Sequence, residues 1–105
     1  MNAVAPTLWQ RNPVLAWREI DGEAVIISPG ESVMHELNGT GSFVWELLDG
    51  RHTPAQIAAL LSAEYEVSSE TALRDTESLL QELASLRLIL QAGVNAGLAG
   101  VPADR

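Results

Sequence analysis

Alternation of apolar and polar residues in the first third of the chain predicts β-structure. Residues 14–20 are strand-like, residues 23–28 are rich in β-branched residues, and residues 32–37 alternate between apolar and polar side chains, as strands of a half-buried sheet do. Asp21-Gly22 separates the first two segments, and glycine supplies the positive φ that a tight hairpin turn requires. Pro29-Gly30-Glu31 is a second turn signal. The three segments therefore predict an antiparallel meander.

The pattern then changes to a helical period, with apolar residues three or four positions apart. Asn38 is placed to cap a first helix that ends at Asp49-Gly50. Thr53 and Pro54 suit the cap and the first position of a second helix. Ser69 is expected to cap a third helix, from residue 70 to about residue 87. This order predicts an α+β domain with winged helix-turn-helix-like topology, in which a three-stranded antiparallel sheet is followed by three helices.

The flanks of this pattern predict the domain boundaries. Residues 1–13 have no periodic pattern and are expected to form an N-terminal arm, ordered only at Trp9. Residues 14–90 form the predicted domain, with residues 88–90 as a short closing strand. Residues 91–105 are rich in glycine and alanine and are expected to be a flexible C-terminal tail.

Composition limits the classes of function. The formal net charge is −8, from 14 acidic and six basic residues, and every basic residue is an arginine. Because nucleic-acid affinity comes largely from cationic side chains on phosphates, this charge argues against nucleic acid and anionic membrane as partners. Cysteine is absent. With no membrane-length apolar run and no signal-peptide pattern, we expect a cytoplasmic protein.

The sequence contains no defensible catalytic or metal-binding pattern. His35 and His52 lie far apart and lack neighbouring ligand residues, so no metal site is predicted. The stretch Gly39-Thr40-Gly41-Ser42 lacks the lysine of a phosphate-binding loop and is interpreted as a helix entrance. The sequence therefore predicts neither an enzyme nor a cofactor.

A longer stretch, His35-Glu36-Leu37-Asn38-Gly39-Thr40-Gly41-Ser42-Phe43-Val44-Trp45-Glu46-Leu47-Leu48-Asp49-Gly50, resembles the PqqD-like family. The similarity continues through Thr53-Pro54-Ala55-Gln56-Ile57, then Asp75 and Leu79-Leu80-Gln81-Glu82-Leu83. It covers roughly residues 23–90. The combination of L-N-x-T-G-x-x-x-W with the later aspartate and leucines is the specific part of the match. The basic, aromatic strand start of the quinone-cofactor branch is not evident here.

The resemblance implies a RiPP recognition element, a non-catalytic domain that binds the leader of a ribosomally made precursor peptide for a modifying enzyme such as a radical SAM protein, peptidase or cyclase. It implies that the leader adds as a strand beside the third strand, in a groove toward the third helix. Main-chain hydrogen bonds would provide affinity and side-chain pockets specificity. The peptide-binding residues expected on this basis are Val33, Met34, His35, Glu36, Leu37, Asp75, Leu79, Glu82, Leu83 and Leu86.

Two other functions remain open from the sequence. A winged-helix DNA-binding regulator has similar topology, but Glu70, Asp75, Glu77 and Glu82 outnumber the arginines of the third helix. A protein–protein scaffold without a peptide substrate would show the same pattern as a leader-binding domain. The exposed strand edge also predicts a homodimer or strand exchange at high concentration.

Overall fold

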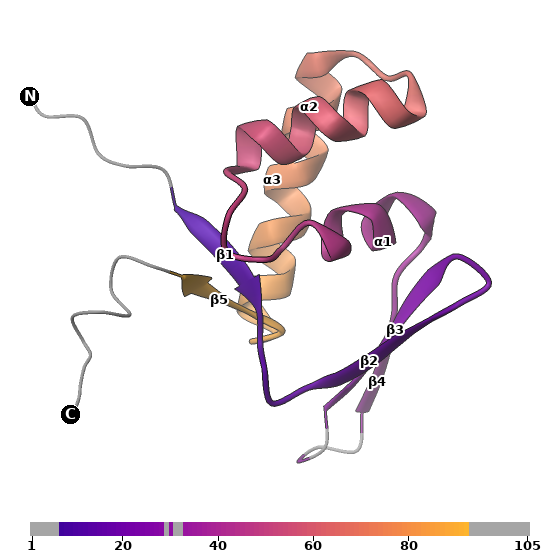
Figure 1. The fold of residues 1–105 in the computed structure, drawn as a ribbon, viewed down its shortest axis with the longest axis vertical. Coiled ribbons are helices and arrows are strands. Elements are labelled where there is room, and N and C mark those ends of the chain that lie inside the picture. The colour runs from indigo at the N-terminus through magenta and orange to yellow at the C-terminus, as the bar shows by residue number, and fades with distance from the viewer. Residues whose placement is uncertain (1–6, 29, 31–32, 93–105) are drawn as a thin grey trace, which may run out of the picture.

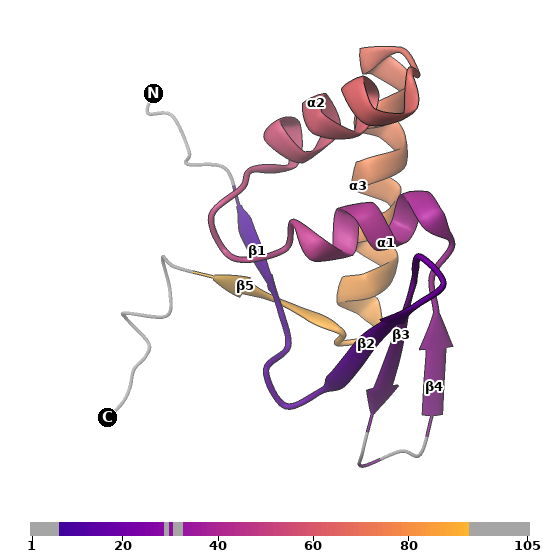
Figure 2. The same ribbon diagram turned by 45° about the vertical axis from the view of Figure 1, so that its right-hand side comes forward.

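The structure is a computed structural model that describes residues 7–28, 30 and 33–92. Three helices lie against two small antiparallel sheets (Figure 1), and in the turned view α1 crosses in front of α3 (Figure 2). The elements, in chain order, are β1 (Leu8–Arg11), β2 (Ala16–Ile20), β3 (Glu23–Ser28), β4 (Val33–Glu36), α1 (Gly39–Glu46), α2 (Pro54–Tyr65), α3 (Ser69–Ser85) and β5 (Ile89–Ala92).

The predicted meander is confirmed as the three-stranded sheet β2-β3-β4. The turn between β2 and β3 has positive φ at both central residues, 53° at Asp21 and 81° at Gly22, as a two-residue hairpin of this hand requires. Residues 29, 31 and 32 of the second predicted turn and strand lie outside the described residues. The α+β fold class, with this sheet followed by three helices, is confirmed.

The helices begin at capping residues. Asn38 accepts a hydrogen bond from the Gly41 amide at 2.8 Å, and Thr53 forms a reciprocal capping box with Gln56. The cap of α3 is Ser68 and not the predicted Ser69, because the Ser68 hydroxyl is the one that accepts from the Thr71 amide. Helix α1 is shorter than predicted and ends at Glu46.

The core lies between the inner face of the three-stranded sheet and the three helices. Trp45 of α1 is fully buried and meets Trp17 of β2 edge to face, with ring centroids 5.9 Å apart. The other large side chains with almost no exposure are Ile26, Leu48, Ile57, Leu83, Leu88 and Ile89. Burial of such apolar surface is the dominant favourable contribution to folding.

Strand β1 falls in the segment for which the sequence predicted an arm ordered only at Trp9. It pairs with β5 over Leu8–Arg11, so that residues from the two ends of the chain lie side by side (Figures 1 and 2). The Arg11 guanidinium also donates to the Trp45 and Glu46 carbonyls at the end of α1, at 2.8 and 3.0 Å. Strand β5 extends two residues beyond the predicted closing strand, through Ala92. The remainder of the predicted tail lies outside the described residues.

Candidate peptide-binding site

The outer edge of β4 carries main-chain groups that point away from the sheet. Within the described residues, β4 pairs only with β3. The Leu37 amide donates to the Ala24 carbonyl of β3 at 3.0 Å. Because main-chain groups in an antiparallel pair alternate in direction along the strand, His35 also faces β3, whereas the amides and carbonyls of Met34 and Glu36 face outward. These two residues provide an open hydrogen-bonding edge.

The opposite edge of this sheet is formed by β2, and its side chains differ. Arg18 and Glu19 are both exposed there, and charged side chains are a common protection of an edge against further pairing. On β4, Val33 is 40% exposed and Met34 60% exposed. The edge of β4 carries one exposed charged residue, Glu36, against two on the edge of β2. The edge of β4 is therefore the better acceptor for an added strand with apolar side chains.

The Ser42 side chain fixes the end of β4 to α1. Its hydroxyl accepts from the Ala24 amide at 2.6 Å and donates to the Leu37 carbonyl at 3.1 Å. The hydroxyl thus takes the place of a direct hydrogen bond from the Ala24 amide to the Leu37 carbonyl, which would otherwise close the ladder between β3 and β4. Ser42 is only 4% exposed, so this bridge holds the strand edge at a set position relative to the first turn of α1.

A hollow of about 280 Å³ lies between the start of α1 and one side of α3. We call it the α1–α3 hollow, and its lining residues are Asn38, Thr40, Gly41, Val44, Leu61, Asp75, Thr76, Ser78, Leu79 and Glu82. It adjoins the end of β4, because a Cβ built on Gly41 would lie 3.4 Å from Leu37 Cβ and 3.8 Å from Leu79 Cδ2. Figure 2 shows β4 running up into the start of α1.

The structure brings some of the predicted site residues together and separates others. Asp75, Leu79 and Glu82 line the α1–α3 hollow, next to the end of β4. Leu83 instead belongs to the core at 2% exposure, so a polar substitution there would unfold the domain. Leu86 caps the C-terminal end of α3, is 47% exposed and does not line the hollow. The site assignment as a whole stays a prediction.

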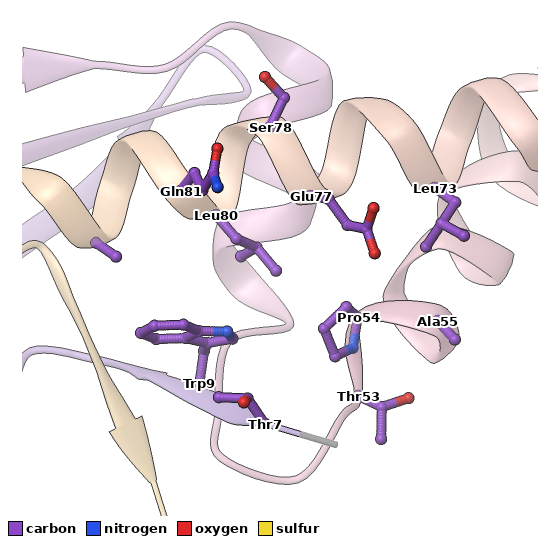
Figure 3. A pocket seen from close by; sticks show the side chains of 11 residues that line it. Thr7, Trp9, Thr53, Pro54, Ala55, Leu73, Glu77, Ser78, Leu80 and Gln81 are labelled. Atoms are coloured by element: carbon purple, nitrogen blue, oxygen red, sulfur yellow. The ribbon is translucent and has the colours of Figure 1, made fainter. Parts of the chain in front are cut away.

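A larger hollow, of about 850 Å³, lies on the other side of α3. We call it the Trp9 hollow, and it was not anticipated from the sequence. In Figure 3, the Trp9 ring lies beneath Leu80, and the Glu77 carboxylate points toward Pro54. Trp9 was the one signal that could have located it, as an aromatic residue in an otherwise patternless segment.

Main-chain groups beside the Trp9 hollow are already bonded. Strand β1 pairs with β5 along one edge. Along the other, the Arg11 amide donates to the Leu48 carbonyl, the Gly50 amide donates to the Trp9 carbonyl, and Gln10 forms a bridge with Asp49. The Trp9 hollow therefore offers side-chain surface, and β1 offers no open strand edge to an incoming peptide.

Titratable groups with shifted pKa values line neither hollow. A hydrogen bond from His52 and a second from the Arg51 amide lower the pKa of the Asp49 carboxyl. Burial, with the nearby Glu19 carboxyl, raises the pKa of Glu46. No group of three or more potential metal ligands occurs among the described residues. In the same part of the chain, no helix is long and apolar enough to cross a membrane.

These features define a class of protein: a small winged-helix-like α+β domain with an open strand edge beside a side-chain hollow. The chain belongs to the family of coenzyme PQQ synthesis protein D, whose family model matches residues 23–89. The predicted resemblance is thereby confirmed. A comparison with curated proteins finds no match.

Two similar solved structures hold a peptide. TbiB1 in complex with the TbiA(beta) leader peptide has a TM-score of 0.69 and 28% identity, and the alignment covers 81% of this chain and 96% of that one. Lasso peptide synthetase B1 complexed with the leader peptide has a TM-score of 0.71 and 27% identity, with 78% and 96% coverage.

A third similar structure is the PqqD part of Methylobacterium extorquens PqqCD. It represents a stand-alone recognition element for ribosomally synthesized and post-translationally modified peptides. Its TM-score is 0.66 at 24% identity, over 79% of this chain and 88% of that one. At this identity the likeness concerns the fold.

Proposed function

We propose that this chain is a non-catalytic peptide chaperone. It binds the leader segment of a ribosomally made precursor peptide as a strand added to β4 and presents that peptide to a modifying enzyme. The observation that carries the proposal is the outward-facing main chain of Met34 and Glu36 beside the α1–α3 hollow. The two leader-peptide complexes among the similar structures support it.

The main chain and the side chains have different roles in strand addition. Main-chain hydrogen bonds to Met34 and Glu36 provide affinity that is independent of sequence, and alternate side chains of the added strand provide specificity. Directly opposed residues on neighbouring strands share a face of the sheet. Peptide residues opposite His35 and Leu37 therefore point inward, toward α1 and α3, while their neighbours point to the outer face with Met34 and Glu36.

The side chains that line the α1–α3 hollow are suited to binding and not to catalysis. Its described lining has two carboxylates, no histidine and no basic side chain, and a nucleophile activated by a base is not among them. The modifying step would then belong to a partner enzyme, a radical SAM protein, peptidase or cyclase. The cytoplasm, where precursor peptides are made, is the compartment that this role requires.

The DNA-binding alternative is not favoured by the surface of α3. Its exposed acidic residues are Glu70, Asp75, Glu77 and Glu82, and Arg74 is the basic residue within the helix. A helix with this charge would be repelled by phosphates in a major groove.

Titration calorimetry with peptides of about 20 residues tests the proposal. The probes are the N-terminal segments of short open reading frames encoded next to this gene, with scrambled sequences as controls. Binding with a Kd in the micromolar range or below, lost when proline replaces residues in the middle of the peptide, supports strand addition because proline removes a ladder donor. Equal binding of leader and scrambled peptides would reject the proposal.

A further inference from the structure

The α1–α3 hollow combines an apolar wall with an acidic rim. Val44 and Leu61 are at most 5% exposed and form its deep wall, together with the half-buried Leu79. Asp75 and Glu82 are exposed at its rim. Successive turns of α3 place Leu79 between the two carboxylates, because residues three or four apart share a helix face. Among the residues that the structure describes, no arginine or histidine lines the hollow.

A buried hydroxyl in the same hollow lacks a partner. Thr76 is 1% exposed and lines the hollow, and its Oγ1 has no hydrogen-bond partner within the described part of the chain. A buried polar group without a partner costs free energy. A ligand with hydrogen-bond donors would offset this cost.

Polar groups of the hollow at the first turn of α1 are already hydrogen-bonded. The Asn38 carboxamide oxygen accepts from the Gly41 amide and from the Thr40 hydroxyl, and the Ser42 amide donates to the Asn38 carbonyl. The first turn of α1 therefore has capped donors and a reduced pull on anions. Two full negative charges on α3 then dominate the local potential.

From this arrangement we infer that the α1–α3 hollow is a specificity pocket for a cationic side chain, arginine or lysine, of the bound peptide. The aliphatic stem lies on Leu79 and the wall behind it, as long basic side chains do on apolar surface. The charged head donates to Asp75 or Glu82 and to Thr76 Oγ1. This inference rests on the proposed function, since it assigns one position of the added strand.

The register of that position follows from the sheet. Leu37 directly follows Glu36, the last outward-facing residue of β4, and lies next to Gly41, which in turn adjoins Leu79. Residues opposite Leu37 point inward. The cationic residue is therefore the one opposite Leu37, at the end of the added strand nearest α3.

Selection from a random library tests the pocket without knowledge of the natural precursor. Peptides of 16 random residues, displayed on their own messenger RNA, are selected on the full chain. The expected result is enrichment of peptides with an arginine or lysine at one fixed position. Replacing that arginine by its neutral isostere citrulline, or that lysine by norleucine, should weaken binding at least tenfold in calorimetry.

A variant pair connects the effect to the hollow. In Asp75→Asn/Glu82→Gln, the arginine and citrulline peptides should bind with equal affinity. In Asp21→Asn/Glu64→Gln, which removes two exposed carboxylates away from the hollow, the tenfold difference should persist. Thr76→Val should raise the unfolding midpoint of the domain without peptide and weaken the binding of the arginine and citrulline peptides alike, because both head groups carry N–H donors. A purely structural threonine would change the unfolding midpoint alone.

Two failures are distinguishable. If selection enriches no peptide above background, strand addition itself is rejected, and this inference with it. If selection enriches peptides whose binding is sensitive to proline but which carry no fixed basic residue, or if citrulline binds as well as arginine, the peptide-binding function stands and the cationic pocket is rejected.

Discussion

The two hollows on either side of α3 differ in size and in the state of the main chain beside them. The Trp9 hollow is about three times larger than the α1–α3 hollow, at about 850 against about 280 Å³. Yet β1, at the Trp9 hollow, is paired on both edges, whereas β4, at the α1–α3 hollow, has an open edge within the described residues. An extended peptide gains its affinity from main-chain hydrogen bonds, so its recognition requires unpaired donors and acceptors more than it requires a large cavity. Cavity size alone would select the side of α3 opposite to the proposed peptide site.

The helical period explains how α3 presents different residues to the two hollows. Asp75 and Glu82 lie on one side of α3, and Leu73, Glu77 and Ala84 lie on nearly the opposite side at 3.6 residues per turn. The core face, with Ala72, Thr76, Leu80 and Leu83, lies between them. Substitutions on α3 can therefore test the two hollows independently, with matched residues as controls.

The largest expected effect is on stability, at the Trp9 hollow. Trp9 packs against the core from β1, so Trp9→Ala should lower the free energy of unfolding by about 2 to 3 kcal/mol. Chemical denaturation measures this change, with Trp9→Phe as the milder control. Under conditions where the variant is folded, its affinity for a leader peptide should equal that of the parent. A large loss of affinity in the folded variant would place the Trp9 hollow in the peptide site.

Proline substitution on β4 should separate the open edge from the paired one. The Glu36 amide faces outward, so Glu36→Pro removes a donor to the added strand and should weaken peptide binding by at least tenfold, about 1.4 kcal/mol. The His35 amide faces β3, so His35→Pro should instead destabilise the domain. Calorimetry and thermal unfolding of both variants provide the comparison. Unchanged peptide affinity in Glu36→Pro would contradict the assignment of the edge.

A leucine pair compares the two sides of α3 directly. Leu79 lines the α1–α3 hollow and Leu73 lines the Trp9 hollow. Leu79→Ala should weaken peptide binding by about three- to tenfold, because it removes apolar surface from the α1–α3 hollow. Leu73→Ala should leave the affinity unchanged. The reverse order of effects, measured by calorimetry with one peptide, would exchange the roles of the two hollows.

The smallest expected effect concerns pH on the side of the Trp9 hollow. The His52 hydrogen bond holds the pKa of Asp49 below its ordinary value of 3.8. A carboxyl with a lowered pKa in the folded state stabilises the protein above its ordinary pKa, and this contribution disappears as the pH falls through the lowered value. Asp49→Asn should therefore flatten the acid limb of the stability profile slightly, since the pair is solvent-accessible.

Denaturation between pH 2 and 7 checks this, with Asp21→Asn as the control. Peptide affinity at pH 7 should be the same in Asp49→Asn and in the parent. A loss of stability in Asp49→Asn that is equal at every pH would mean that the charge of Asp49 has no part in it.

Local sequence patterns were sufficient to predict the secondary structure of most of the chain. The hairpin at Asp21-Gly22, the caps Asn38 and Thr53 and the three-strand, three-helix order follow from short-range preferences that the structure confirms. The cap of α3 was wrong by one residue, since Ser68 and Ser69 have equal local suitability. Of the five site residues expected on α3, Asp75, Leu79 and Glu82 meet at one hollow, whereas Leu83 is core. A leucine stripe alone cannot say which of its members face solvent.

What the sequence determined by itself is every element whose cause lies within a few residues: turns, caps, periodic faces and the family to which they belong. Only the tertiary structure decided that residues 8–11 form a strand, because its partner β5 is about eighty positions away and its own residues have no period. It alone also closed the edge of β1 and left that of β4 open. Such differences arise from contacts between distant segments, and these leave no periodic trace in either segment.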